Sequence, residues 1–147
     1  MRNGILLIIA ILLSACATPG PWGNYASARP SQNTRMAEDS FNQLKSLYPP
    51  AKTRLTIDQP VDDPFGMVLV DRLRKAGYGV AETPPSKTKK RTDIRTSVTG
   101  IPFHYVVDHI AGAGYRVSLR VGTETLSRVY QASGNDLIPA GYWAKQQ

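Results

Sequence analysis

Two segments of the chain place apolar residues at the spacing of an α-helix. The first has one apolar face, at Ala37, Phe41, Leu44 and Tyr48. Asn33-Thr34 predicts its start, because a cap residue precedes the acids Glu38 and Asp39, and Pro49-Pro50 predicts its end. The second helix is predicted to begin at Asp62-Asp63-Pro64 and to end at Gly77. Its inward positions are Phe65, Leu69, Leu73 and Ala76.

Alternating apolar and polar positions predict the strands. Residues 53–58 and 78–83 flank the second helix, so strand, helix and strand could form one crossover unit. Further strands are predicted over residues 103–108, 115–121 and 124–131, with turns at 111–114 and 122–123. The sequence therefore predicts a small two-layer α+β domain, with about two helices packed on a mainly antiparallel sheet.

The first residues have the order of a secretory signal. Arg2 supplies a positive charge, Ile5 to Leu13 is an unbroken apolar run, and Leu13-Ser14-Ala15-Cys16 resembles a lipobox. The run is short for a membrane span, which needs roughly 20 apolar residues. We expect cleavage between Ala15 and Cys16 and a lipid on the Cys16 thiol. The alternatives are an ordinary signal peptide with a chance cysteine, or an uncleaved anchor.

Cys16 is the only cysteine, so the mature chain has no internal disulfide, and acylation would consume the free thiol. We expect this covalent lipid to be the only non-protein group, and we expect no cofactor. From what is known of lipoprotein sorting, Ala17 favours the outer membrane, facing the periplasm, over the inner membrane. The expected organisation is a signal peptide over residues 1–15, a lipidated amino terminus and flexible linker over 16–32, and a periplasmic domain over 33–147. Two interpretations of Trp22 and Tyr25 stay open: they contact lipid headgroups or a partner, or they are incidental aromatic residues of the linker.

The formal net charge is +7, and loss of Arg2 with the signal peptide leaves +6. Five of the 18 basic residues lie in one short stretch, at Lys87, Lys89, Lys90, Arg91 and Arg95. The simplest interpretation is a solvated loop, because no aromatic residues are interleaved for base stacking. The alternative function is a periplasmic binding module for nucleic acid or another anionic ligand, which steep salt dependence of binding would reveal.

Enzyme signatures are missing from the sequence. His104 and His109 are five positions apart, so in one strand they point to opposite faces and cannot chelate the same metal. Asp58, Asp62 and Asp63 are interpreted as cap and turn residues. No serine lies in a Gly-x-Ser-x-Gly turn, and no acid pair suggests a cell-wall hydrolase. We therefore expect no catalytic residue and no metal site.

Several segments together resemble the TrbH family of conjugal transfer lipoproteins. The most specific is the run from Leu47 to Leu55, Leu-Tyr-Pro-Pro-Ala-Lys-Thr-Arg-Leu. The others are Ala37-Glu38-Asp39, Gln43-Leu44, Phe65-Gly66, Leu69-Val70, Leu73-Arg74, Gly77-Tyr78, Tyr115-Arg116-Val117, Leu126 to Tyr130 and Pro139 to Trp143. The resemblance implies a lipoprotein of a conjugative type IV secretion system, which anchors and assembles the mating-pair channel with subunits resembling TrbG and TrbI.

Four residues near the carboxyl end are candidates for partner binding or domain docking: Arg128, Tyr130, Tyr142 and Trp143. Core packing is an equal alternative for Tyr130, and Trp143 could pack back on its own domain. Arg128 shares a strand face with Leu126 and Tyr130, so its charge would need a partner if it is buried.

The lipid anchor gives the first testable prediction. Cys16→Ala should abolish incorporation of labelled palmitate and should leave the signal peptide uncleaved by the lipoprotein peptidase, because the acylated thiol is the feature that this enzyme recognises. Metabolic labelling followed by gel electrophoresis measures both effects. A wild-type protein that takes up no labelled fatty acid would overturn the lipoprotein interpretation.

Overall fold

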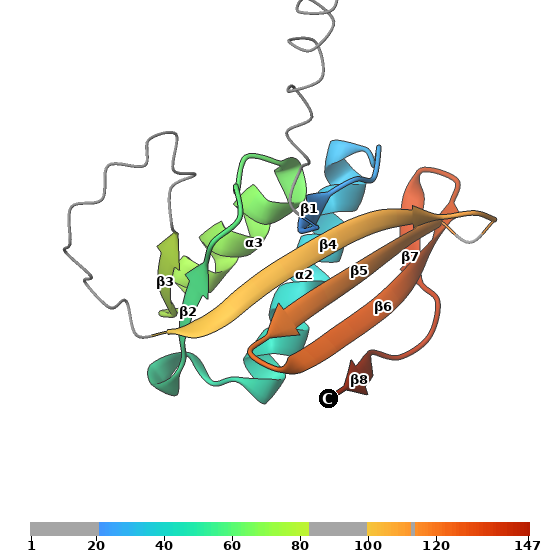
Figure 1. Ribbon diagram of the computed structural model, residues 1–147. Helices are drawn as coiled ribbons and strands as arrows, with labels where there is room; N and C mark the ends of the chain where they lie inside the picture. Colours follow the sequence, from blue (N-terminus) through green and yellow to red (C-terminus); the bar gives the residue numbers. More distant parts are fainter. Residues whose placement is uncertain (1–20, 83–99, 113) are drawn as a thin grey trace, which may run out of the picture.

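The computed structural model describes residues 21–82, 100–112 and 114–147. In this part of the chain two α-helices, α2 (Pro30–Leu47) and α3 (Pro64–Lys75), pack on one face of a mixed eight-stranded sheet (Figure 1). The predicted two-layer α+β class is confirmed. Neither of these helices is long and apolar enough to cross a membrane.

The sheet has the strand order β3-β2-β4-β5-β6-β7. Its strands are β1 (Gly23–Asn24), β2 (Arg54–Ile57), β3 (Gly79–Glu82), β4 (Ile101–Ile110), β5 (Gly114–Val121), β6 (Glu124–Ser133), β7 (Asp136–Pro139) and β8 (Ala144–Gln146). A short 3₁₀ helix, η1 (Pro50–Lys52), precedes β2. Strands β4, β5 and β6 form an antiparallel meander at the centre. Strand β2 runs parallel to both β3 and β4, β1 adds to β4 in parallel, and β8 pairs with β6 beside β7.

The predicted crossover unit is confirmed, because α3 connects the parallel strands β2 and β3. Asp63 caps α3 by accepting a hydrogen bond from the Gly66 backbone N–H at 2.9 Å. At the other end Gly77 has φ +92°, a conformation that glycine adopts readily. Its N–H bonds to the Arg74 carbonyl, and the Tyr78 N–H bonds to the Leu73 carbonyl, which closes the last turn.

The start of α2 is the main correction to the sequence analysis. The helix begins at Pro30 rather than at Asn33-Thr34, because Pro30 suits the first helical position and the Gln32 side chain accepts from the Arg29 N–H at 3.0 Å. Asn33 is instead buried one turn inside the helix. Because β1 also pairs with β4, secondary structure begins before residue 33, within the predicted linker. Strands β7 and β8 were not predicted either.

The core lies between the helices and the inner face of the sheet. Side chains alternate along β4, so that Phe103, Tyr105 and Val107 are buried against the helices. In α2 the predicted positions Ala37 and Leu44 are buried, whereas Phe41 and Tyr48 lie at the margin of the core. In α3 the predictions at Phe65, Leu69 and Leu73 are confirmed, and Ala76 is half-buried.

Helix α3 approaches the sheet closely at Gly66. A Cβ there would lie 2.7 Å from Tyr105 Cζ and closer still to the Tyr105 hydroxyl. Gly66→Ala should therefore lower the free energy of unfolding by about 1–3 kcal/mol, the range for overpacked sites. Alanine is intrinsically the better helix former by about 1 kcal/mol, so a loss of stability isolates the steric overlap. Urea denaturation followed by circular dichroism measures the change, with exposed Met67→Ala as the control. An unchanged or raised midpoint for Gly66→Ala would contradict this packing.

Candidate functional site

The candidate site lies where α2 faces β6 and the carboxyl-terminal strands. The Asp39 carboxylate, on α2, accepts hydrogen bonds from Arg128 Nη1 at 3.1 and 2.9 Å and from the Tyr130 hydroxyl at 2.6 Å. Both donors project from the inner face of β6, two residues apart. The side chains of Arg128 and Asp39 are only 18% and 25% exposed. The sequence argument that a buried Arg128 needs a partner is thus met by Asp39.

The same arginine also holds the carboxyl-terminal segment. Arg128 Nε donates to the Gly141 carbonyl at 2.9 Å, just before β8. Burial, and then the hydrogen bond to Asp39, raise the pKa of Tyr130 far above its ordinary value, so its hydroxyl stays a donor. These contacts join α2, β6 and the carboxyl-terminal segment in one polar cluster, which we call the Asp39 cluster (Asp39, Arg128, Tyr130 and Gly141).

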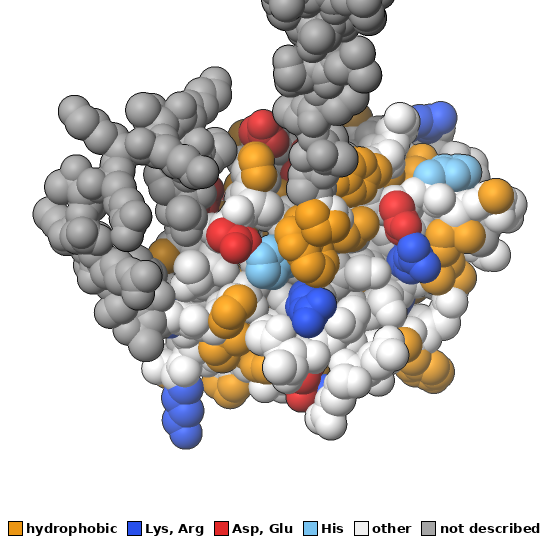
Figure 2. Space-filling model, viewed as in Figure 1, with side chains coloured by type: hydrophobic (Ala, Val, Ile, Leu, Met, Phe, Trp, Pro, Cys, Tyr) orange, Lys and Arg blue, Asp and Glu red, His pale blue; other side chains and the backbone are white. Residues whose placement is uncertain are grey.

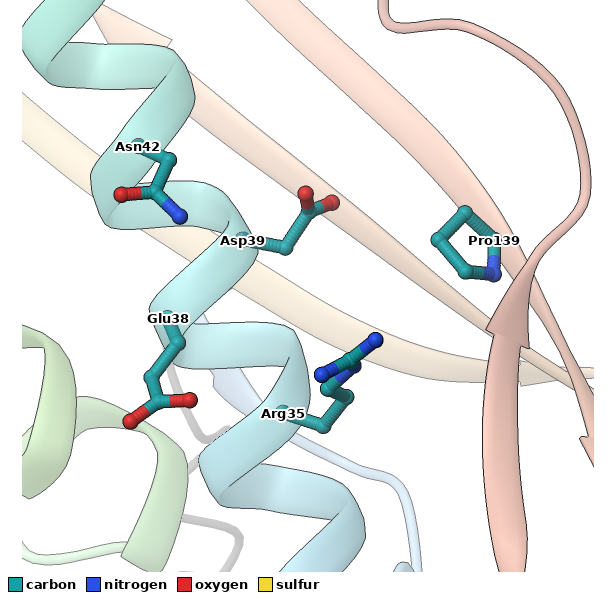
Figure 3. A pocket seen from close by; sticks show the side chains of 5 residues that line it. All are labelled: Arg35, Glu38, Asp39, Asn42 and Pro139. Carbon is teal, nitrogen blue, oxygen red and sulfur yellow. The ribbon is translucent and has the colours of Figure 1, made fainter.

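A shallow hollow of about 190 Å³ lies beside this cluster, between α2 and β7. In Figure 3, Arg35 and Asp39 project from α2 toward the space in front of Pro139, whereas Glu38 turns the other way. Glu38 forms an ion pair with Arg72 of α3, which explains its direction. Among the residues that the structure describes, no group of three His, Cys, Asp or Glu side chains is placed to hold a metal ion.

The four candidate residues occupy different environments. Tyr130 is fully buried in the core and Trp143 packs against the core at its margin, as the core-packing alternatives expected. Tyr142 is 97% exposed. Partner binding by any of them stays a prediction. Ala15, Cys16 and the basic residues from Lys87 to Arg95 lie outside the described residues.

Sequence reasoning missed a second cluster at the other end of α2. The Glu124 carboxylate accepts hydrogen bonds from the Tyr48 hydroxyl and from Lys145 Nζ of β8, the latter at 2.7 Å. The hydrogen bond from Lys145, and then that from Tyr48, lower the pKa of Glu124. Burial of the Tyr48 ring, followed by the hydrogen bond to Glu124, raises the pKa of Tyr48 to about 12. No periodicity pointed to this cluster, because its members are far apart in the sequence. The pairing of β8 with β6 brings Lys145 to Glu124, and the packing of α2 on the sheet brings Tyr48 there.

The outer face of the sheet is not covered by α2 or α3, and Figure 2 views the molecule from this side. His104 lies on this face, and His109 alternates to the other side of β4, near the exposed end of the strand. The Trp22 ring stacks on His104 with a centroid distance of 4.6 Å, and His104 Nε2 pairs with Asp58. Trp22 is therefore part of the folded domain, which the sequence left undecided.

The fold and these clusters define a small α+β domain whose buried polar side chains join its helices to its sheet. The family model described as conjugal transfer protein TrbH matches residues 19–147. The chain therefore belongs to the TrbH family of conjugal transfer proteins. Searches of curated proteins and of solved structures found no match.

The Asp39 cluster predicts a large difference between two adjacent carboxylates of α2. Asp39→Ala leaves the Arg128 charge and the Tyr130 hydroxyl largely buried without their acceptor, so it should cost about 2–4 kcal/mol of the free energy of unfolding. Glu38→Ala removes the ion pair with Arg72. The Glu38 side chain is 39% exposed and that of Arg72 is 47% exposed, so the substitution should cost less than about 1 kcal/mol. Chemical denaturation of both purified variants measures the difference. Equal losses would show that the Asp39 cluster does not carry this energy.

Proposed function

We propose that this protein is an outer-membrane lipoprotein of a conjugative type IV secretion system, and that it anchors and helps to assemble the DNA-transfer channel. The observation that carries the proposal is the match of the conjugal transfer family to residues 19–147, which include the whole described domain. The lipobox-like Leu13-Ser14-Ala15-Cys16 precedes this region directly. The anchor is a lipid on Cys16, and Ala17 favours the outer membrane over the inner one.

The contacts of the described residues support a role in assembly rather than in chemistry. Asp39 and Asp63 accept hydrogen bonds from Tyr130 and Tyr105, and Asp63 also caps α3. These carboxylates thus have structural roles that account for their partial burial. A lipid-anchored domain acts by position, because it raises the local concentration of its partners at the membrane. The partners proposed are channel subunits resembling TrbG and TrbI.

The carboxyl-terminal strands are the proposed contact region for these subunits. β7 and β8 lie at the edge of the sheet, where backbone groups are available to pair with another strand. Tyr142, between them, is almost fully exposed, and an exposed aromatic is a frequent anchor at protein interfaces. Arg128 holds this segment on the domain by donating a hydrogen bond to the Gly141 carbonyl.

Deletion of the gene should sharply reduce plasmid transfer without changing plasmid replication, because the protein contributes position to the channel. Cys16→Ala should mimic much of the deletion if the variant is exported and stable. Mating frequency is the measurement, with plasmid copy number and immunoblots of periplasmic fractions as controls.

Detergent extracts of the same strains test the partners. Affinity capture of the wild-type protein should recover other channel subunits, and capture of Tyr142→Ala should recover less of them with unchanged protein stability. Normal mating in the deletion strain, or captures that never contain channel subunits, would remove the conjugation proposal.

A further inference from the structure

Residues 22–25 are fixed to the domain, and we call them the amino-terminal clamp. β1 pairs in parallel with β4, with Gly23 opposite Val106 and Asn24 opposite Val107. The Tyr25 N–H extends the pairing by donating to the Val107 carbonyl at 2.7 Å. The clamp is therefore a strand of the sheet rather than part of a free linker.

Side chains hold the clamp on both faces of the sheet. On the outer face Trp22 stacks on His104, and the Arg120 guanidinium lies 6.0 Å from the centre of the indole ring. Figure 2 shows hydrophobic and cationic side chains meeting beside a histidine on this face. On the helix side, Asn24 Nδ2 donates to Asn33 Oδ1 at 2.9 Å and to Asp63 Oδ1 at 3.2 Å. Asn24 thereby links the clamp to the first turns of α2 and α3.

The clamp limits how far the domain can lie from a lipid on Cys16. Six residue steps separate Cys16 from Trp22, and a fully extended chain covers about 3.3–3.6 Å per step, so the limit is about 20 Å. A free linker up to residue 33 would allow about 60 Å by the same measure. The clamp therefore cuts the greatest possible reach to about a third.

We propose that the clamp holds the amino-terminal end of α2 against the bilayer, with phospholipid headgroups as the partner of this surface. The proposal rests on the lipidation of Cys16 proposed above. Tyr25, 53% exposed, lies at this end, and tyrosine and tryptophan are the residues that favour the membrane–water interface. β1 and the carboxyl terminus lie at opposite ends of the domain (Figure 1). The carboxyl-terminal strand β8 is thus directed away from the membrane, toward the channel subunits.

Two exposed serines on α2 provide a matched pair of reporters. Ser31 lies in the first turn and Ser46 in the last, and 15 residues at 1.5 Å each separate them by about 22 Å along the helix. Ser31→Cys and Ser46→Cys are each labelled with a fluorophore in the full-length lipidated protein, where acylation leaves only the introduced thiol to react. The protein is reconstituted in vesicles of phosphatidylethanolamine and phosphatidylglycerol that carry nitroxide headgroups. Because of their separation, we expect quenching at residue 31 to exceed that at residue 46 by at least about twofold.

Release of the clamp gives the second arm of the experiment. Trp22→Ala combined with Asn24→Ala in both reporter proteins removes the side-chain contacts on both faces of the sheet, so it should bring the quenching ratio toward about one, because the chain from Cys16 gains length and rotational freedom. An unchanged ratio in this double variant would contradict the role of the clamp. Tyr142→Ala, which removes an exposed aromatic far from the clamp, should leave the ratio unchanged. Equal quenching at both positions in the lipidated parent, or stronger quenching at residue 46, would overturn the inference alone. Absence of fatty acid on Cys16 would overturn it together with the proposed anchoring function.

Discussion

Each of the two described helices is tied to the sheet by one carboxylate that accepts a hydrogen bond from a sheet tyrosine. Asp63, at the start of α3, accepts from the Tyr105 hydroxyl of β4, and Asp39, in α2, accepts from the Tyr130 hydroxyl of β6. A carboxylate that is partly removed from water is costly unless donors satisfy it, so each helix has a preferred position relative to the sheet, at which this cost is met. The apolar contacts alone are less directional, since hydrophobic burial has no preferred geometry.

The two carboxylates differ in the other donors that satisfy them. Asp63 also caps α3 and accepts from Asn24, so one side chain joins α3, the sheet and β1. Asp39 also accepts hydrogen bonds from Arg128, whose Nε donates to the Gly141 carbonyl. Each hydrogen bond to a charged group contributes about 1.5–3 kcal/mol. This is a large part of the net stability of a small domain, about 5–15 kcal/mol, so these bonds can hold the two chain ends in place. The segments thus fixed are the clamp and the carboxyl-terminal strands.

These two segments define the functional geometry that we propose. The clamp lies near the start of α2, and β8 lies beside its end, where Lys145 and Tyr48 meet at Glu124. The length of α2, 18 residues at 1.5 Å each, sets a distance of about 27 Å between them. We propose that, in a conjugal transfer protein with a lipid on Cys16, such a domain acts as a spacer, with one end for the membrane and the other for protein partners.

The sequence by itself determined the parts of the fold that depend on neighbours along the chain. The start of α3 at Asp63-Pro64, its end at Gly77, the crossover between β2 and β3 and the central meander all follow from caps, glycines and alternation. It also gave the family resemblance and the need of Arg128 for a partner. It did not give Asp39 as that partner, because 89 residues separate the two and Asp39 fits equally well as an acid in the first turn of a helix. Only the tertiary structure decided this pair, the sites of β1 and β8 on the sheet and the stacking of Trp22 on His104. Two- and three-residue strands carry too few positions for a periodic signal, and they form only because the edges of β4 and β6 are already in place to accept their hydrogen bonds.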